Sequence, residues 1–356
     1  MPIERFLFDM VDGQPVEGFI LSAGGLEATV IAHGARLVRM MVPDRDGRTA
    51  DVVLGFDRLA GYLASDAYFG ATCGRYGNRI GGAAFTLDGV RHALSVNEPP
   101  NHLHGGADGF DRRIWRAVVE EADNAVTFML VSPDGDQGYP GTLTATTRYR
   151  LTADGVLDIE MTAASDRPTV VNLVHHSYWN LGGHGSGSGL GDVRGHRLAV
   201  RGGFITPVGP DLIPTGEVRP VDGTAFDLRG GIDLGGVDLG AALERAGGFG
   251  FDHNWCLEGP AGTLRPAAWL EHPASGRRME LETDQPGLQV YSGGYIGARS
   301  GGQVAGKGGQ TYGPFAGLAL ETQRFPGSPN IGHFPSARLD PGETRRHTMR
   351  LRFLTA

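Results

Sequence analysis

The feature that most constrains the fold of this chain is an alternation of apolar and polar side chains with a period of two residues. Residues 142–163, TLTATTRYRLTADGVLDIEMTA, consist of two alternating segments around Asp154-Gly155. Residues 83–94 show the same pattern of two alternating segments around Asp88-Gly89. Asp-Gly between alternating segments is a strong short-range signal for a β-hairpin. Because side chains on a strand point alternately to opposite faces, the pattern predicts antiparallel strands with one buried face.

Further segments extend this pattern along the chain. Residues 125–141 hold an alternating segment followed by a turn-rich loop, residues 277–293 hold two segments separated by Pro-Gly, and residues 347–355 form a last one. Helical patterns are confined to residues 57–65 and 240–247, each long enough for about two turns. Many short strands and few helices predict an all-β fold, an antiparallel sandwich or barrel.

Composition agrees with this fold and excludes several classes of protein. Glycine makes up 58 of 356 residues, more than twice the usual share of about 7%, as expected for a chain with many turns. The net charge of -8 argues against a nucleic-acid binder, which would carry a basic face. The two cysteines have no metal-type spacing, and no apolar run approaches the length of a membrane span. Without a recognisable signal peptide, we expect a cytoplasmic protein.

Two glycine-rich segments resemble phosphate-binding loops but lack their essential parts. Residues 301–309, GGQVAGKGG, carry the glycine and lysine spacing of a nucleotide-binding loop, but Gly308 stands where a magnesium-binding Ser or Thr is required. Residues 182–192 have alternating glycines without the dinucleotide spacing. We therefore interpret both as ordinary loops.

The candidate functional residues begin with two adjacent histidines. His175 and His176 lie in residues 170–183, VVNLVHHSYWNLGG, and on a strand they must point to opposite faces. His102 and His104 lie two residues apart in NHLHGG and would share a face if that segment is a strand. Either one of them is functional and the other structural, or both bind a metal together with His176.

Polar residues in other apolar or glycine-rich segments complete the set. Arg75, Asn78 and Arg79 lie in GRYGNRIGG, Asp252 opens DHNW, and Glu321 follows an apolar strand. A carboxylate at the end of a buried strand is costly unless it is hydrogen-bonded or functional. Carboxylates, amides and guanidinium groups bind hydroxyls, and a carboxylate with an imidazole provides a base and an acid. These residues favour a sugar site with acid–base chemistry.

Ordered blocks over nearly the whole chain resemble the aldose 1-epimerase family of the galactose mutarotase type. The blocks are VVLGFDRLAGYLASDAYFGATCGRYGNRI, NHLHGG, SPDGDQGYPG, VVNLVHHSYWNLGG, LIPTGEVRPVDGTAFDLR, DHNW, QPGLQVYSGGYI, ALETQRFPGSPN and FPSARLDPGE. The resemblance implies a single domain over residues 1–356, a large antiparallel β-sandwich (a supersandwich) with an open sugar cleft. It also implies interconversion of the α and β anomers of free aldoses such as glucose, galactose or xylose, without a cofactor.

The resemblance assigns roles to individual residues. It implies that Glu321 is the catalytic base, His176 the catalytic acid and His104 a second active-site histidine, with no metal. The residues it implies for sugar binding are Asn78, Arg79, Asp252 and Gln289. Because a carboxylate and an imidazole stabilise each other's charges, we expect a raised pKa for His176 and a lowered one for Glu321. The family usually has Ala at the position of Gly77 and often Asn at that of His175; we expect Gly77 only to loosen its turn.

Other functions remain open from the sequence. A hexose-6-phosphate 1-epimerase of the same fold would need basic residues at the cleft rim, to which Arg75 and Arg324 could contribute. A non-catalytic sugar-binding protein would not need a general acid. A metal-dependent enzyme would use His102, His104 and His176. For the main hypothesis we expect a monosaccharide substrate, no nucleic-acid or membrane partner, and a monomer or homodimer; the preferred aldose is left open.

Overall fold

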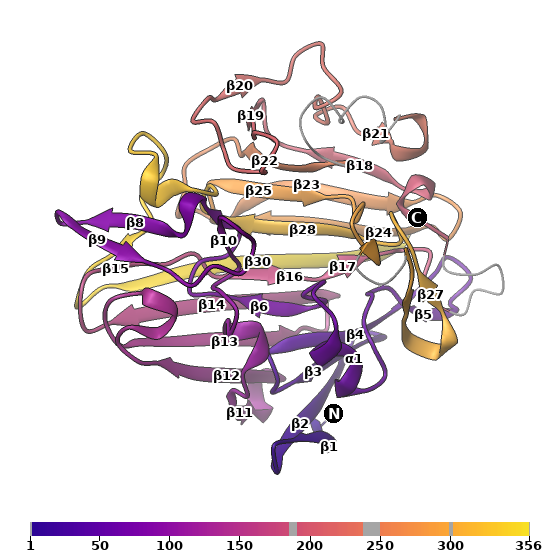
Figure 1. Ribbon diagram of the computed structural model, residues 1–356. Helices are drawn as coiled ribbons and strands as arrows, with labels where there is room; N and C mark the ends of the chain where they lie inside the picture. Colours follow the sequence, from indigo (N-terminus) through magenta and orange to yellow (C-terminus); the bar gives the residue numbers. More distant parts are fainter. Residues whose placement is uncertain (1, 185–190, 238–249, 299–301, 356) are drawn as a thin grey trace.

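The structure is a computed structural model that describes residues 2–184, 191–237, 250–298 and 302–355 (Figure 1). The predicted helix at 240–247 and the middle of the glycine-rich segment 182–192 lie outside these residues. In the described part, α1 (Leu59–Ala64) is the only α-helix, and no helix there is long and apolar enough to cross a bilayer. The strand pairs are antiparallel, which confirms the all-β prediction.

Three larger sheets form the body of the molecule, and Figure 1 shows their long strands crossing it. The five-stranded sheet consists, in spatial order, of β1 (Glu4–Val11), β2 (Gln14–Ala23), β3 (Leu26–Ile31), β4 (Arg36–Pro43) and β5 (Thr49–Asp51). The nine-stranded sheet consists of β11 (Arg116–Glu120), β12 (Ala125–Ser132), β13 (Leu143–Leu151), β14 (Val156–Ser165), β30 (Thr344–Thr355), β24 (Arg277–Thr283), β23 (Arg265–His272), β18 (Arg197–Val200) and β21 (Ile232–Asp233). The six-stranded sheet consists of β17 (Tyr178–Trp179), β28 (Leu318–Gln323), β25 (Gly287–Tyr291), β22 (Asp252–Cys256), β19 (Phe204–Thr206) and β20 (Arg219–Pro220).

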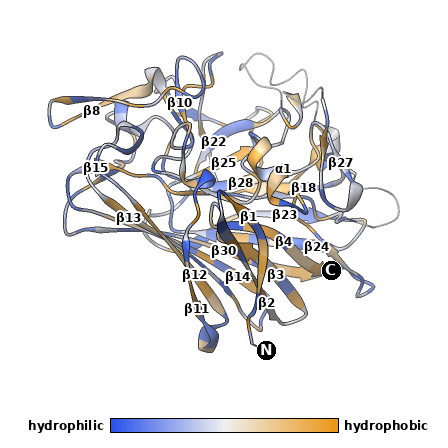
Figure 2. Ribbon diagram, turned by 60° about the horizontal axis from the view of Figure 1, so that its bottom comes forward, coloured by the Kyte–Doolittle hydropathy of each residue, from blue (hydrophilic) through white to orange (hydrophobic). Residues whose placement is uncertain are grey.

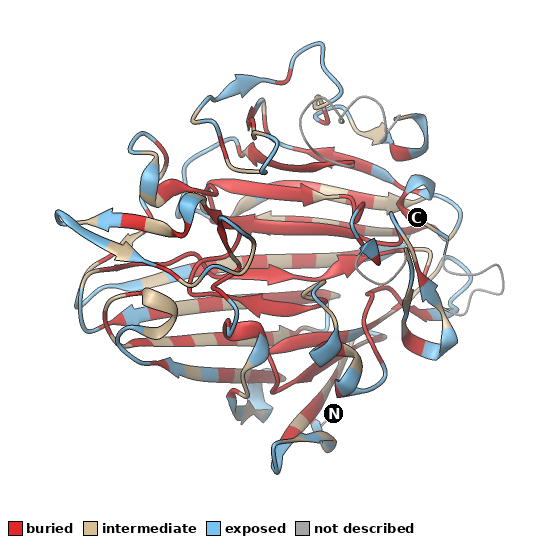
Figure 3. Cartoon of the chain, viewed as in Figure 1, coloured by how far each residue is buried: buried red, intermediate tan, exposed pale blue. Residues whose placement is uncertain are grey.

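Five two-stranded pairs complete the described strands. They are β6 (Ala71–Cys73) with β16 (Val174–His176), β7 (Arg79–Ile80) with β10 (His102–Leu103), β8 (Ala84–Leu87) with β9 (Val90–Ala93), β15 (Thr169–Val170) with β29 (Arg338–Leu339), and β26 (Val304–Ala305) with β27 (Thr311–Tyr312). The exposed hairpin of β8 and β9 contrasts with the buried central strands in Figure 3.

Both predicted Asp-Gly hairpins are present. β13 and β14 pair in register around Asp154-Gly155, and β8 and β9 pair around Asp88-Gly89. In the second hairpin both loop residues have positive φ, 50° at Asp88 and 77° at Gly89, as a two-residue type I′ turn requires. The two strands predicted in residues 277–293 also form, but they belong to different sheets: β24 lies in the nine-stranded sheet and β25 in the six-stranded one.

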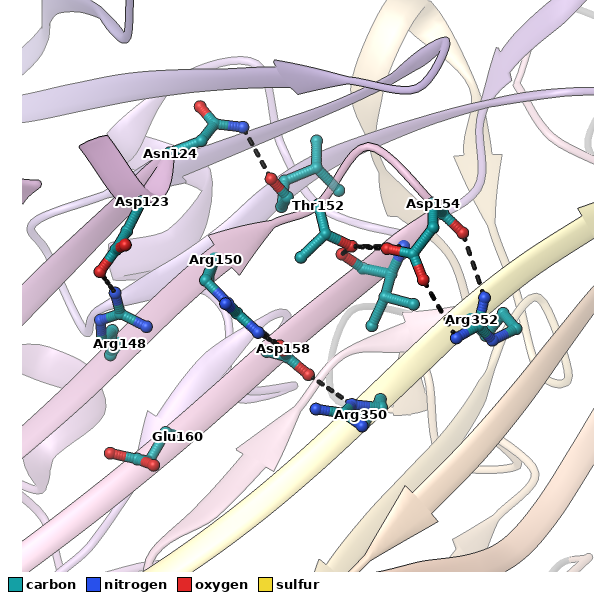
Figure 4. Close-up of polar contacts among 12 residues, drawn as sticks. Asp123, Asn124, Arg148, Arg150, Thr152, Asp154, Asp158, Glu160, Arg350 and Arg352 are labelled. Carbon is teal, nitrogen blue, oxygen red and sulfur yellow. Dashed lines mark hydrogen bonds and ion pairs between the residues drawn. The ribbon is translucent and has the colours of Figure 1, made fainter. Parts of the chain in front are cut away.

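Residues of the nine-stranded sheet alternate in burial, as in β13, and the hydropathy colours change along its strands (Figure 2). This alternation gives the sheet a charged outer face and an apolar inner face. Arg150, Asp158 and Arg350 lie in one row across β13, β14 and β30, and both arginines donate to the Asp158 carboxylate, at 2.5 and 2.7 Å (Figure 4). The two arginines are partly exposed whereas Asp158 is buried between them, so this row links three strands across the outer face.

The inner faces of the three larger sheets meet in one apolar core. Leu157, Met161, Leu281 and Leu351 of the nine-stranded sheet belong to the same buried cluster as residues of the other two sheets. From the six-stranded sheet this cluster includes Trp255, Leu288, Val290, Leu318 and Leu320. The six-stranded sheet therefore has one face committed to the core, and its other face is free to carry a site.

Candidate active site

The polar residues of the candidate site lie on the face of the six-stranded sheet opposite the core. Gln289 of β25 is paired in register with Glu321 of β28 on one side and with Asn254 of β22 on the other. Their strand neighbours Leu288 and Leu320 point into the core. Because adjacent residues face opposite ways, the same alternation that builds the core places a row of polar groups on the other face.

A cleft of about 370 Å³ opens above this row. Its walls come from the six-stranded sheet, from β16, from the β7–β10 pair with its flanking residues, and from the loops around residues 66–68, 210–212 and 295–298. The predicted site residues that line it are Asn78, Arg79, His104, His176, Asp252 and Glu321. Gln289 lies beside them, since its amide donates to Asp252 Oδ1 at 2.6 Å. The structure thus brings all seven predicted residues together.

His176 and Glu321 face each other at the centre of the cleft. Nε2 of His176 lies 3.5 Å from Oε1 of Glu321, and the two side chains are only 4% and 3% exposed. His175 points the other way, as expected for adjacent strand residues. Its Nε2 lies 2.7 Å from the Ser177 hydroxyl and its Nδ1 3.3 Å from the hydroxyl of Tyr149, a core residue.

Burial sets the pKa values of this pair, and the expected directions are wrong. Burial lowers the pKa of His176 to about 4, against a weaker opposing hydrogen bond to its own carbonyl. Burial also raises the pKa of Glu321 well above its usual range; Asp252 raises it further and Arg79 partly opposes. Desolvation of the charged forms outweighs their mutual attraction. Both shifts favour the uncharged forms, a protonated Glu321 carboxyl beside a neutral His176 imidazole.

His104 is held as a neutral hydrogen-bond donor. The backbone N–H of Asn78 donates to its Nδ1 at 3.1 Å, so the ring proton of the neutral imidazole is on Nε2. Burial, followed by the charges of His176 and Arg79, lowers its pKa well below the usual value. The ring centroid of His104 lies 5.0 Å from that of His176. His104 is therefore placed to donate from Nε2 beside the acid–base pair.

A hydrogen-bonded network fixes the sugar-binding candidates. Arg79 makes a bidentate contact with Glu98, from Nε at 2.6 Å and Nη2 at 2.8 Å, and its Nη1 lies 3.8 Å from Asp252. Gln289 bonds Asp252 and in turn accepts from Gln323 at 3.1 Å. Burial disfavours the charge of Arg79, but the hydrogen bonds to Glu98 and the charge of Asp252 leave its pKa raised. Arg79 therefore stays a cation that faces the cleft.

Three groups in the cleft have the residue types of a metal site. His104, His176 and Glu321 offer ligand atoms within 4.8 Å of one another, and two imidazoles with one carboxylate form a donor set that zinc uses. Since Nδ1 of His104 accepts the Asn78 N–H, its Nε2 carries the proton and has no lone pair to offer a metal. The donor set does not fit a metal ion.

The other predicted metal set is not assembled. His102 lies in β10, but its neighbour His104 has a left-handed backbone with φ of 49°, so the two do not share a strand face. Both ring nitrogens of His102 are engaged, Nδ1 with Ser95 O at 2.6 Å and Nε2 with the Tyr139 hydroxyl at 2.8 Å. His102 is a buried structural residue.

Two arginines that could have served a phosphate lie outside the cleft. The buried guanidinium of Arg75 donates to Ser132 and to the carbonyls of Pro133 and Pro140. Arg324 follows β28 and lines hollows that share no residue with the cleft. Lys307 of the phosphate-loop look-alike is also buried, and its Nζ donates to Asp51 at 2.5 Å.

Sequence reasoning missed several cleft residues. Glu98 holds Arg79, and Tyr68, Tyr178 and Tyr291 supply aromatic walls. The ring of Tyr68 lies 4.6 Å from that of His104. No pattern in the sequence marks Tyr68, whereas Glu98 stands just before NHLHGG and could have been proposed as a partner for an arginine.

The expectation for Gly77 is also wrong. A Cβ atom at Gly77 would lie 2.4 Å from Cγ2 and 2.7 Å from Cβ of Val174. The glycine therefore permits close packing against β16, two residues before His176, and does more than loosen a turn.

Comparison with known proteins gives a consistent result. The sequence model of a family described as aldose 1-epimerase matches residues 19–352. The galactose mutarotase of Bos taurus is 43% identical over 341 residues, 96% of this chain and 95% of that protein. The aldose 1-epimerase of Escherichia coli strain K12 is 36% identical over 335 residues, 93% of each chain.

Solved structures agree with these relatives. A GalM/aldose epimerase homologue from C. elegans has a TM-score of 0.83 at 28% identity, covering 95% of this chain and 98% of its own. Galactose 1-epimerase from Lactobacillus acidophilus NCFM has a TM-score of 0.82 at 26% identity, covering 99% of both chains.

Proposed function

The chain belongs to the aldose 1-epimerase family and interconverts the α and β anomers of an aldose, and we propose that Glu321 and His176 transfer the protons in this reaction. The observation that carries the proposal is the 3.5 Å approach of these two side chains in a cleft lined by hydroxyl-binding groups. Acid and base must reach neighbouring oxygens of one sugar. A facing pair at the centre of the cleft supports that requirement.

The reaction needs one base and one acid. Glu321 removes the proton of the C1 hydroxyl while His176 donates a proton to the ring oxygen, and the bond from C1 to the ring oxygen breaks. The free aldehyde rotates about the C1–C2 bond and recloses on its other face. Glu321 then returns a proton to the C1 oxygen, and His176 takes one back from the attacking hydroxyl. The pair ends with the single proton with which it began.

The position of that proton follows from the contacts of the pair. Burial favours the proton on Glu321, whereas the proposed step starts with it on His176. The two arrangements differ by one transfer between facing groups. A C1 hydroxyl that donates to the Glu321 carboxylate stabilises its charged form, and the charge of nearby Arg79 acts in the same direction. Substrate binding therefore favours the reactive arrangement.

The remaining residues hold the sugar. His104 donates from Nε2 towards the ring oxygen or a neighbouring hydroxyl as charge develops there. Arg79, Asp252, Gln289 and Asn78 orient the other hydroxyls, which keeps C1 between acid and base. Among the described residues that line the cleft, Arg79 is the only Lys or Arg, and it is engaged by Glu98. This favours a free aldose over a sugar phosphate as substrate.

Polarimetry on freshly dissolved α-D-glucose, α-D-galactose and α-D-xylose tests the proposal and ranks the sugars. Wild type should speed the approach to anomeric equilibrium, and Glu321→Gln should be at least about 10²-fold slower. His175→Asn is the matched control, because it alters the adjacent histidine on the other face. Full activity of Glu321→Gln would refute the role of the glutamate, and a preference for glucose 6-phosphate over glucose would refute the free-sugar assignment.

A further inference from the structure

Two arginines lie at the ends of core strands: Arg324 directly follows β28, three residues after Glu321, and Arg345 is the second residue of β30. In β30 the inward-facing residues are His347, Met349, Leu351 and Phe353, and Arg345 has the same alternation at the start of the strand. The hydroxyl of Thr322 in β28 lies 2.6 Å from Nε2 of His347. Arg324 comes two residues after Thr322, so its side chain points to the same side of the strand. Both arginines thus continue rows that build the core.

Arg324 and Arg345 line a common hollow of about 470 Å³. Nε of each is buried without a hydrogen-bond partner. Among the described residues, none accepts a hydrogen bond from the Arg324 side chain, whereas Nη2 of Arg345 donates to the carbonyl of Arg338. No carboxylate of the described residues lies within the 4.0 Å of an ion pair with either arginine. Burial, followed by the charge of Arg345, lowers the pKa of Arg324 to about 10. Two guanidinium groups with unpartnered Nε atoms therefore share one hollow, which Arg346, Asp284 and Glu343 also line.

Among the described residues, other buried guanidinium groups have more of their nitrogens engaged, although Nε of Arg36 also lacks a hydrogen-bond partner. Arg277 donates to the carbonyls of Val42, Leu181 and Arg48 at about 3.0 Å each. Arg36 donates to two carbonyls in the same way. Because a buried donor without a partner is costly, the arrangement at Arg324 and Arg345 calls for an acceptor.

The acidic residues that line the hollow already accept hydrogen bonds from other groups. Oδ1 of Asp284 accepts the Thr348 N–H at 3.0 Å and the Gln285 amide at 2.6 Å. Glu343 accepts the N–H of Asp340 at 3.3 Å. These carboxylates lower the local positive potential but provide no direct acceptor for the unpartnered Nε groups.

We propose that Arg324 and Arg345 form a binding site for an oxyanion, a phosphate group held between two guanidinium groups. The planar fork of a guanidinium matches two oxygens of a phosphate, so a phosphate group could accept from the free fork of Arg324 and from the remaining donors of Arg345, which include its unpartnered Nε. The site is separate from the cleft but connected to it. The backbone N–H of Arg324 donates to Oδ1 of Asn172 at 2.9 Å. The side-chain amide of Asn172 donates to the carbonyl of Gly77, which precedes Asn78, at 3.0 Å.

Isothermal titration calorimetry with inorganic phosphate at constant ionic strength tests the site. Wild type should bind one phosphate per chain, and Arg324→Gln with Arg345→Gln should weaken binding at least tenfold. Arg346→Gln is the matched control, because Arg346 lines the same hollow but pairs with Glu160 on the outer face. Titration with glycerol 3-phosphate separates the two sources: tighter binding than inorganic phosphate identifies a phosphate ester, and equal or weaker binding identifies free phosphate.

A second measurement needs no variant. Phosphate should protect Arg324 and Arg345, but not Arg346, from modification by phenylglyoxal, as read by peptide mass spectrometry of the wild-type protein. Absence of phosphate binding to wild type, equal weakening by the Arg346 change, or unprotected modification of the pair would each overturn the proposal.

Discussion

The N–H of Asn78 donates to Nδ1 of His104 at 3.1 Å, and the N–H of His104 donates back to the carbonyl of Asn78 at 3.1 Å. Both residues have left-handed backbones, with φ of 62° and 49°. This reciprocal contact determines which nitrogen of His104 carries the proton. It also ties a proposed catalytic donor to a proposed sugar-binding residue, so the two are positioned as one unit.

The tautomer predicts how His104 variants behave. His104→Ala should lower kcat by about 10²–10³-fold, the effect of removing one donor to a developing negative charge. His104→Gln keeps an amide N–H donor and should retain more activity than the alanine variant. Polarimetry gives the rates, and thermal unfolding checks the fold. Equal rates for the two variants would mean that a donor is not what the reaction needs.

The pKa shifts predict a broad bell-shaped pH profile for kcat/KM. The reactive pair carries one proton. Below about pH 4 it gains a second, because the pKa of His176 lies near that value. At high pH it loses its last proton, and the raised pKa of Glu321 moves that limb upwards. The two apparent values belong to the pair. Initial rates from pH 3.5 to 9 measure both limbs; an acid limb near pH 6.5 would contradict the shift of His176.

Buried histidines predict a loss of stability in mild acid. Burial lowers the pKa of His33 and His253 to about 4 and that of His175 and His196 to about 3. Below pH 6.5 these histidines bind protons in the unfolded chain but stay neutral in the folded chain. Their contribution to the free energy of unfolding is therefore fully present above pH 6.5 and is lost as the pH decreases towards 4. Each histidine contributes up to about 1.4 kcal/mol per pH unit.

Urea unfolding between pH 6.5 and 5 isolates this effect, since ordinary carboxylates stay ionised there. His33→Leu is a direct check, because burial is the largest cause of the lowered pKa of His33, followed by the charge of Arg36, and a hydrogen bond with the Arg112 backbone only partly opposes them. In the variant, the slope of unfolding free energy against pH should decrease by the amount that corresponds to about one proton fewer taken up on unfolding. An unchanged slope would show that His33 is already charged in the folded protein.

The contact of Arg79 with Glu98 predicts a change in substrate binding more than in turnover. Glu98→Ala removes both acceptors that hold the guanidinium, so Arg79 loses its fixed position beside Asp252. KM should rise about tenfold with kcat within a few-fold, as expected for an interaction made equally in the ground and transition states. Glu98→Gln keeps one acceptor, so its KM should lie between those of wild type and Glu98→Ala. A fall in kcat at constant KM would instead make Glu98 part of the chemistry.

Close packing at Gly77 predicts a specific rescue. Gly77→Ala should destabilise the protein by about 1–3 kcal/mol, the usual cost of overpacking, because the new methyl would overlap Val174. Gly77→Ala combined with Val174→Ala relieves the overlap. Val174→Ala should therefore lower the free energy of unfolding less in the Gly77→Ala background than in the wild-type protein. Additive losses in a double-mutant cycle of unfolding free energies would exclude the contact.

Local patterns predicted local structure well. The Asp-Gly hairpins formed where alternation placed them, and the opposite directions of His175 and His176 followed from strand geometry. The gathering of the seven site residues followed from resemblance, since they come from distant strands and loops. Pairing between β24 and β30 or between β25 and β28 depends on long-range contacts that alternation does not encode.

The remaining differences share one physical cause, the depth of burial. The pKa values of His176 and Glu321 moved against expectation because desolvation outweighed their attraction. The steric role of Gly77 and the aromatic wall at Tyr68 also depend on which segments meet in space. A single sequence shows which groups are present but not how much water each loses.

The position of β30 has a consequence for how this protein is made. This strand lies between β14 and β24 in the nine-stranded sheet, yet it is the last of the described strands in the chain. While a ribosome synthesises the chain, β14 and β24 are both complete before the strand that joins them exists. Their edges stay open to other chains during that interval. β30 therefore joins two groups of strands into one continuous sheet, and that sheet cannot be completed before β30 has been synthesised.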